Sequence, residues 1–556
     1  MRKFILKIVV CITFLICCLP TTIKADDKVA RIERTGVEYT TLMEAMGNVE
    51  DGDTVTILKD ITLAGGPSEL NQILINRNLT IQGVDDQDLV TITRNFDWGS
   101  ALNIWFDDPS YVVTIKDLII SNENGDTAIH IDSKKGKINL DNVRATASTN
   151  PANYGFALLF SFNSNSLTVD ISNCYFKGVS GIFIRGTNHT INVDNTDIIS
   201  TVDFVTTDEG AIVLYYELDP YPIGAQNTQV TITDSRISAN NNDNYYAIID
   251  KARGGSVIFD EPTASNLVGK IYTVVAVDSD NNMYESLQQA IDDNIANDKT
   301  VILYKDINLN DTIDIEGEIT IKSYDNNTLI SSADPAINIK TPGPVTIKYL
   351  TIECVSGNAV NISDTVENTE LNIDQCDLTG YSALAVYGKG ATVNVNVSNL
   401  TGVNDKEYGD GSNNHSTIFV ANKNVSITVN NFPVGKVIAE STEGKAKQWI
   451  AGADPGSSEG LQLYINSEFE TNGSAAIYGF DPEEGLNVKV RKQYANQLKS
   501  EGFRVSAPDA NNMITVLGFL PPTGDDINIS IWISIMLVSV VGILGAIVYG
   551  KKKELI

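Results

Sequence analysis

A short pattern of apolar residues recurs along this chain and restricts its possible folds. Two apolar residues alternate with polar ones, two polar residues follow, and the apolar alternation resumes, as in Val113, Ile115, Leu118 and Ile120. Copies of this pattern begin at Val113, Ile138, Val169, Ile191, Val230, Val345, Leu371, Val393 and Ile427. Alternation with a period of two predicts strands with one buried face, so the pattern indicates an all-β protein.

The spacing of the copies predicts a solenoid of stacked coils. Ile138 follows Val113 by 25 residues, and Ile191 follows Val169 by 22. A repeat of this length cannot bury its apolar edge alone, whereas stacking buries the edge and pairs each strand in parallel with the next coil. A second short strand is expected between copies, at Ala128–Ile131, Gly181–Ile184, Ala336–Ile339, Ala359–Ile362 and Ala383–Val386.

The two polar residues in each copy are expected to form a corner. They include Asn or Asp in many copies, at Asp117, Asn142, Asn173, Asn195, Asp234 and Asn431. Both side chains tolerate the left-handed backbone that a tight turn requires. The residue after the corner, such as Leu118, Cys174 or Cys376, is expected to point into the core.

These rungs and the intervening strands resemble the right-handed parallel β-helices of the pectin-lyase-like superfamily, over roughly residues 79–434. The resemblance implies a right-handed parallel β-helix. It leaves the activity open, because this superfamily includes lyases, glycosidases, phage tailspikes and catalytically silent adhesins.

The N-terminus has the features of a secretory signal peptide over residues 1–25. Arg2 and Lys3 precede an apolar run, and cleavage is expected after Ala25. A membrane anchor is a weaker interpretation because the run is short for a span. A lipoprotein signal through Cys17 or Cys18 is weaker still.

Two segments resemble each other and divide the solenoid into modules, at residues 26–270 and 271–440. Residues 39–46 precede a strand at 55–63, and residues 284–291 precede one at 301–309. Leu42, Ala45 and Met46, like Leu287, Ala290 and Ile291, have the spacing of one apolar helix face. We therefore expect a strand-helix cap at the start of each module.

Beyond Glu440 the rung pattern is predicted to stop. Residues 441–519 are expected to form a linker and a small α+β module, with strands near 461–466, 486–490, 503–506 and 513–517. A helix is expected over 492–500, ended by Gly502.

The last residues, 520–556, resemble the LPXTG sorting signal of Gram-positive surface proteins. The pentapeptide is Leu520, Pro521, Pro522, Thr523 and Gly524, followed by an apolar run over 527–549 and three lysines. The run is long enough for a transmembrane helix. The resemblance implies cleavage after Thr523 by a sortase, transient membrane insertion, and covalent attachment of Thr523 to peptidoglycan in the cell wall. A plain single-pass anchor is the alternative.

Composition restricts the partners of the chain. The formal net charge is −30, which disfavours nucleic acid and other anionic polymers. Of the six cysteines, three lie in the signal peptide, and no disulfide framework is evident.

Catalytic motifs of the superfamily are not evident. Trp105 to Asp108 approaches a lyase motif but lacks the histidine, and Asn195 to Asp197 matches only the start of a polygalacturonase motif. His130, His189 and His415 are scattered. No catalytic residue and no cofactor is expected. Asp278 to Asn282 resembles the start of a calcium loop without its glycine and glutamate, and we interpret it as a turn, with calcium left open.

A candidate ligand site lies in the longest insertion between rungs, between Ile191 and Val230. It contains Tyr215, Tyr216, Glu217, Asp219 and Tyr221. Tyrosine rings and carboxylates suit sugars, although the rings also suit packing of the loop onto the solenoid.

The sequence thus predicts a wall-anchored surface protein of a Gram-positive bacterium. Adhesion to glycans or host matrix, without catalysis, is the favoured function. The alternatives are a wall-tethered polysaccharide lyase or glycoside hydrolase and a structural wall protein without a specific ligand.

Overall fold

The computed structural model describes residues 28–63, 72–94, 96, 99–217, 223–295, 300–403, 416–440, 447–452, 459–471, 475–476, 487–500 and 502–519. They form two compact units, which divide between Ser286 and Leu287. Most described residues lie in strands, and most strands pair in parallel with the strand one coil later. The fold is therefore all-β and consistent with a parallel β-helix.

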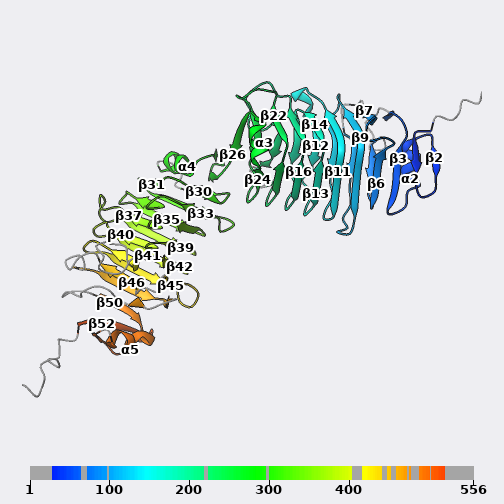
Figure 1. Ribbon diagram of the computed structural model, residues 1–556. Helices are drawn as coiled ribbons and strands as arrows, with labels where there is room; N and C mark the ends of the chain where they lie inside the picture. Colours follow the sequence, from blue (N-terminus) through cyan, green and yellow to red (C-terminus); the bar gives the residue numbers. More distant parts are fainter. Residues whose placement is uncertain are drawn as a thin grey trace, which may run out of the picture. The chain divides into compact units, whose positions relative to one another are not determined.

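The first unit contains three parallel series of strands, each strand contributed by a successive coil (Figure 1). The first series is β3 (Asp53–Ile57), β6 (Leu79–Gly83), β9 (Val112–Asn122), β11 (Lys137–Ala147), β13 (Thr168–Ser172), β16 (Thr190–Asp194), β21 (Gln229–Thr233) and β24 (Ser256–Phe259). The second is β4 (Ile61–Leu63), β7 (Val90–Arg94), the later parts of β9 and β11, β14 (Tyr175–Gly178), β17 (Asp197–Ser200), β22 (Arg236–Ala239) and β25 (Leu267–Val268). The third is β5 (Ile73–Ile75), β8 (Ser100–Ile104), β10 (Thr127–Ile131), β12 (Phe156–Phe160), β15 (Ser180–Ile184), β18 (Ile212–Leu214), β23 (Tyr246–Asp250) and β26 (Lys270–Thr273).

The second unit repeats this arrangement. Its first series is β29 (Thr300–Leu303), β32 (Ile319–Ser323), β35 (Pro344–Lys348), β38 (Glu370–Asp374), β41 (Thr392–Asn396), β44 (Ser426–Asn430), β47 (Gln462–Asn466) and β50 (Asn487–Arg491). The second is β30 (Ile307–Leu309), β33 (Thr328–Ser331), β36 (Thr351–Cys354), β39 (Asp377–Gly380), β42 (Asn399–Val403), β45 (Lys436–Glu440) and β48 (Glu468–Thr471). The third is β31 (Ile313–Ile315), β34 (Ile337–Ile339), β37 (Val360–Ile362), β40 (Leu384–Val386), β43 (Ser416–Val420), β46 (Lys447–Gly452) and β49 (Ala475–Ala476).

The register of these strands is the predicted one. Val113 pairs with Ile138, Ile138 with Val169, and Val169 with Ile191. In the second unit, Val345 pairs with Leu371 and Leu371 with Val393. All of these side chains are fully buried, so the apolar alternation of the sequence forms a core along each stack.

The corners are also as expected in most coils. The backbone φ is positive at Asp117, Asn142, Asn173, Asn195 and Asp234. In the second unit the equivalent left-handed residues are Tyr349, Gln375 and Val397, so the turn imposes this conformation on residues that seldom adopt it. Asn431 has no positive φ and is buried, which corrects its assignment as a corner of the same kind.

Strand and helix elements begin the first coil stack as predicted. β1 (Ala30–Ile32) pairs antiparallel with β2 (Val37–Tyr39) and with β3, and α2 (Leu42–Gly47) lies between β2 and β3. The Thr41 hydroxyl caps α2 by accepting from the Glu44 N–H at 3.2 Å. The elements β27 (Ala276–Asp278), β28 (Met283–Tyr284) and α4 (Leu287–Asn294) follow in the same order later in the chain. Leu42 and Ala45, like Leu287, Ala290 and Ile291, are buried, as their spacing predicted.

The predicted end of the repeat at Glu440 is wrong. β47 pairs in parallel with β44, and β48 pairs in parallel with β45, so another coil follows. The sequence carries only part of the signal, because Leu463 and Ile465 keep the apolar alternation but Ser467 and Phe469 follow one position sooner than in the other rungs. The coils end where β52 (Met513–Phe519) pairs antiparallel with β50 and with β51 (Phe503–Val505). Between β50 and β51 lie a 3-10 turn, η3 (Lys492–Tyr494), and α5 (Ala495–Ser500), close to the expected helix.

Candidate functional site

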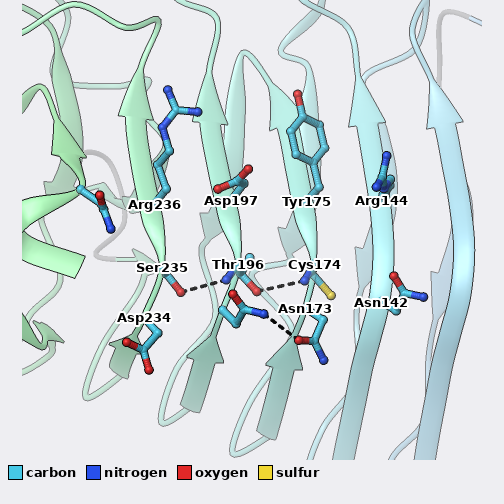
Figure 2. Close-up of a pocket in the computed structure, with 12 residues that line it drawn as sticks. Asn142, Arg144, Asn173, Cys174, Tyr175, Thr196, Asp197, Asp234, Ser235 and Arg236 are labelled. Atoms are coloured by element: carbon cyan, nitrogen blue, oxygen red, sulfur yellow. Dashed lines mark hydrogen bonds between the residues drawn. The ribbon is translucent and has the colours of Figure 1, made fainter. Parts of the chain in front are cut away.

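A polar groove of about 640 Å³ crosses five neighbouring coils of the first unit (Figure 2). We call it the corner groove, because it follows the turns between the first and second strand series. Its lining residues are Asn142, Arg144, Asn173, Cys174, Tyr175, Asn195, Thr196, Asp197, Asp234, Ser235, Arg236 and Asn266. These residues come from β11, β14, β17, β22 and the adjoining turns, so stacking alone brings them together.

One wall of the corner groove is a row of long polar side chains. Arg144 is in register with Tyr175, Tyr175 with Asp197, and Asp197 with Arg236. Figure 2 shows these four side chains next to one another on successive strands. Neighbouring strands lie about 4.8 Å apart, so the row presents one new functional group at each such step. Along this row the functional groups are, in order, a guanidinium, a phenol, a carboxylate and a second guanidinium.

The opposite wall consists of the left-handed corner residues. Asn195 Nδ2 donates to Asn173 Oδ1 at 2.9 Å, and Asn142 Nδ2 donates to Asp117 Oδ1 at 2.9 Å. Asn173 Nδ2 donates to Asp141 rather than to Asn142. Each amide therefore links to a neighbouring coil while Asn173, Asn195 and Asp234 stay exposed. The amide and carboxylate groups add hydrogen-bond donors and acceptors along the groove.

The floor of the groove is a chain of buried hydroxyls. Ser235 N–H donates to Thr263 Oγ1 at 3.1 Å, Thr196 N–H to Ser235 Oγ at 3.1 Å, and Cys174 N–H to Thr196 Oγ1 at 3.2 Å. The Thr196 and Ser235 hydroxyls in turn donate to the carbonyls of Asp194 and Thr233. The left-handed corner interrupts the hydrogen bonding between neighbouring strands. The hydroxyl of the following coil then accepts from the buried N–H that would otherwise lack a partner.

The thiols beside these corners are unsuited to nucleophilic chemistry. Burial raises the pKa of Cys174 to about 12 and that of Cys376 to about 11. Both side chains point into the core, as predicted, and Cys354 is buried as well. Thiolate is the reactive form, so these cysteines are core residues.

The sorting signal lies outside the described residues. This applies to Leu520, Pro521, Pro522, Thr523, Gly524, to the apolar run 527–549, and to the cleavage residue Ala25. Among the residues that the structure describes, no helix has the length and apolar character needed to cross a membrane.

The tyrosine segment is only partly arranged as expected. Tyr216 in β19 (Tyr216–Glu217) is 2% exposed, so its ring does not offer contact area to a ligand as expected; it packs onto the solenoid instead. Tyr215 is half-buried, and burial followed by the charge of Glu217 raises its pKa. Asp219 and Tyr221 lie outside the described residues.

The segment from Asp278 to Asn282 is a turn. The Asp278 carboxylate accepts from the N–H groups of Asp280 and Asn282 at 3.0 and 2.8 Å, and from the Tyr284 hydroxyl at 2.9 Å. It joins β27 to β28. Across the described part of the chain, no group of three or more histidine, cysteine or carboxylate side chains has the arrangement of a metal site.

The lyase-like and hydrolase-like sequences lie at turns and corners of the coils. Trp105 is exposed, and Asp108 accepts from the Ser110 N–H at 2.9 Å to form a turn. Asn195, Thr196 and Asp197 form one corner of the groove. His189 is buried, its Nδ1 accepts from the Leu167 N–H at 3.2 Å, and burial lowers its pKa to about 4.

Sequence reasoning identified the corners but missed the groove. The outward residues two positions after Asn142, Asn173, Asn195 and Asp234 are Arg144, Tyr175, Asp197 and Arg236, and aligning these copies would have shown the column. The chain matches no known family model, and no curated protein is significantly similar to it in sequence.

Proposed function

We propose that this protein is displayed on the wall of a Gram-positive bacterium and binds glycans in the corner groove without catalysis. Two sequence resemblances support the location. The N-terminal segment resembles a signal peptide, and residues 520–524 with the apolar run and lysines resemble a sortase substrate. The partners of the chain are then the sortase, peptidoglycan through Thr523, and a glycan of the host or its matrix.

The proposed architecture is a right-handed parallel β-helix in two modules, with a transmembrane helix over 527–549 before sortase cleavage. The parallel pairing from coil to coil supports the helix, and the resemblance to pectin-lyase-like proteins supports the handedness. A stack of coils suits a surface protein, because identical steps build a long and stable face for contacts.

The observation that carries glycan binding is the row Arg144, Tyr175, Asp197 and Arg236 opposite the corner amides. The groove is open, extended and rich in donors and acceptors, whereas sites for apolar ligands are enclosed and apolar. Sugars offer hydroxyls to carboxylates, amides and guanidinium groups, and C–H faces to a tyrosine ring. An elongated oligosaccharide matches both the length and the chemistry of this row.

A glycan array with the mature protein, residues 26–523, tests this proposal. The double variant Arg144→Ala/Tyr175→Ala should bind the ligands of the wild type at least about tenfold more weakly, since it removes a charged donor and a ring. Lys177→Ala is the matched control, because Lys177 lies on the same strand as Tyr175 and does not line the groove. Equal binding by the double variant and the wild type, with unchanged circular dichroism, would contradict the proposal.

One observation favours glycoside hydrolysis as a second candidate. Asp197 and Asp234 both line the groove, and glycosidases commonly use two carboxylates across the scissile bond. Chromatography of the array ligands after incubation distinguishes the two functions. Hydrolysis predicts shortened products that disappear in Asp197→Asn, whereas binding alone leaves every ligand intact.

A further inference from the structure

A second group of polar side chains lies on the outside of the third strand series of the first unit. Arg185, Tyr215 and Lys251 each follow the end of a strand, β15, β18 and β23. Their N–H groups donate to the carbonyls of Phe160, Ile184 and Leu214 at 3.0, 2.8 and 3.0 Å. The three residues therefore occupy the same position on three successive coils.

Arg185 is surrounded by aromatic rings. Its guanidinium carbon lies 4.6 Å from the ring centre of Phe162, 5.0 Å from Phe183, 5.2 Å from Tyr215 and 6.0 Å from Phe156. The rings of Phe183 and Tyr215 also contact each other, with centres 5.5 Å apart. Such ring faces attract a cation, and their packing fixes the position of the guanidinium. We call this arrangement the Arg185 box.

The guanidinium in the Arg185 box has no ion-pair partner among the described residues. Its Nε is buried and makes no hydrogen bond there. The neighbouring cation differs, because Lys251 Nζ lies 2.7 Å from Asp208 Oδ1. In a chain with a net charge of −30, an arginine held by rings rather than by a carboxylate is unexpected. Because Nε is buried, an anionic ligand would meet the terminal nitrogens of this guanidinium.

The edge of the Arg185 box can also contact a ligand. Phe162 is 40% exposed, and the ring of Tyr154, which is 63% exposed, lies 6.4 Å from that of Phe156. Exposed aromatic rings beside a fixed cation provide an apolar face and a charge within one small surface. This combination matches a ligand that carries a carboxylate on a ring with C–H groups.

We propose that the Arg185 box binds the carboxylate of an acidic sugar, a uronic or a sialic acid, with the sugar packed against Phe162 and Tyr154. A guanidinium has two parallel N–H groups that fit the two oxygens of a carboxylate, and such charge-assisted pairs are among the stronger hydrogen bonds. The inference rests on glycan binding as the proposed function and names an acidic sugar as the ligand class. It uses a surface separate from the corner groove.

Glu217 acts against the ligand in this arrangement. Glu217 follows Tyr215 by two residues in β19, and the Tyr215 ring lies 5.2 Å from the guanidinium carbon. Burial lowers the pKa of Arg185, and the charge of Glu217 opposes that effect. An incoming carboxylate therefore meets repulsion from Glu217. Removing the charge of Glu217 therefore strengthens binding of an acidic sugar. A purely structural role of the Arg185 box does not predict this result.

Binding to two matched pairs of ligands tests the inference. One pair is trigalacturonate and its methyl ester, and the other is sialyllactose and its methyl ester, so each pair differs in its carboxylate charge. The mature protein should bind at least one acid about tenfold more tightly than the ester. Arg185→Gln should weaken binding of that acid about 10- to 100-fold, Arg185→Lys less, and Glu217→Gln should strengthen it several-fold. The ligand pair that shows these changes in affinity identifies the class of acidic sugar.

Failure of this inference is distinguishable from failure of the proposed function. Equal binding of acids and esters, or an acid preference that survives in a folded Arg185→Gln variant together with an unchanged affinity of Glu217→Gln, would overturn the Arg185 box. The Arg144→Ala/Tyr175→Ala variant should keep the acid preference. Loss of neutral-glycan binding in that variant supports the corner groove regardless of the result at Arg185.

Discussion

The hydroxyl of Thr196 accepts a hydrogen bond from the N–H of Cys174, one coil earlier, at 3.2 Å. The same contact recurs in the second unit, where Ser398 Oγ accepts from the Cys376 N–H at 3.0 Å. A buried N–H without a partner destabilises a protein, so a small hydroxyl-bearing residue at this position supports the corner of the preceding coil.

Replacing Thr196 with Val should lower the free energy of unfolding by about 1–3 kcal/mol, because the shape is kept while the Cys174 N–H loses its acceptor. Thr196→Ser is the matched control, which keeps the hydroxyl and removes one methyl group, worth about 0.8 kcal/mol. Urea unfolding followed by circular dichroism measures both. A smaller loss for Val than for Ser would show that the hydroxyl does not support the corner.

The buried cysteines should resist thiol reagents in the folded protein. A chain that begins at Asp26 keeps Cys174, Cys354 and Cys376, and burial raises the pKa of each. Ellman's reagent at pH 8 should modify almost no thiol without denaturant and all three in denaturant. Rapid modification of the native chain would show that one of these side chains is accessible.

Acid should destabilise the protein partly through His189. Its ring is neutral in the folded state, since Nδ1 accepts from a backbone N–H, and its folded pKa is about 4 against 6.5 for an exposed histidine. The unfolded chain therefore binds a proton at a higher pH than the folded chain. Stability should fall as the pH drops from about 6.5 to 4 and change no further from this group below 4, by about 3 kcal/mol in total.

Comparing melting temperatures of wild type and His189→Gln between pH 7 and 4 isolates this contribution. The variant is expected to be less stable at pH 7, since it alters the contacts with Leu167 and Ser164, but its stability should depend less on pH. Parallel curves for the two proteins would contradict a neutral buried His189.

Thr523→Ala should prevent covalent attachment to the wall, if the pentapeptide is a sortase substrate. The expected result is a shift of the protein from the fraction released by muramidase to the membrane or the medium. Leu517→Ala, an exposed position just before the signal, serves as the control and should stay in the wall. Equal wall labelling of the Thr523 variant and the wild type would exclude this mode of anchoring.

The sequence by itself determined the coil. Alternating apolar residues select one face of each strand, and the Asn or Asp corners allow the left-handed turn, so both are local properties that repeat along the chain. Val113, Ile138 and Val169 paired as their spacing predicted, and Leu118, Cys174 and Cys376 are buried. The tenth rung, at Leu463, departs from the pattern because its corner is one residue shorter, so that Ser467 and Phe469 take the inward positions.

The tertiary structure decided which outward side chains form a groove or a cluster. Arg144 and Arg236 lie 92 positions apart in the chain, yet two intervening coils place both on one groove. Tyr215 and Tyr216 are adjacent in sequence, and only the structure separates the half-buried ring beside Arg185 from the buried one. The reason is physical: the apolar pattern constrains residues that face the core, whereas outward residues carry no such pattern, and their contacts depend on the register of the coils and on how inserted segments pack over the strands.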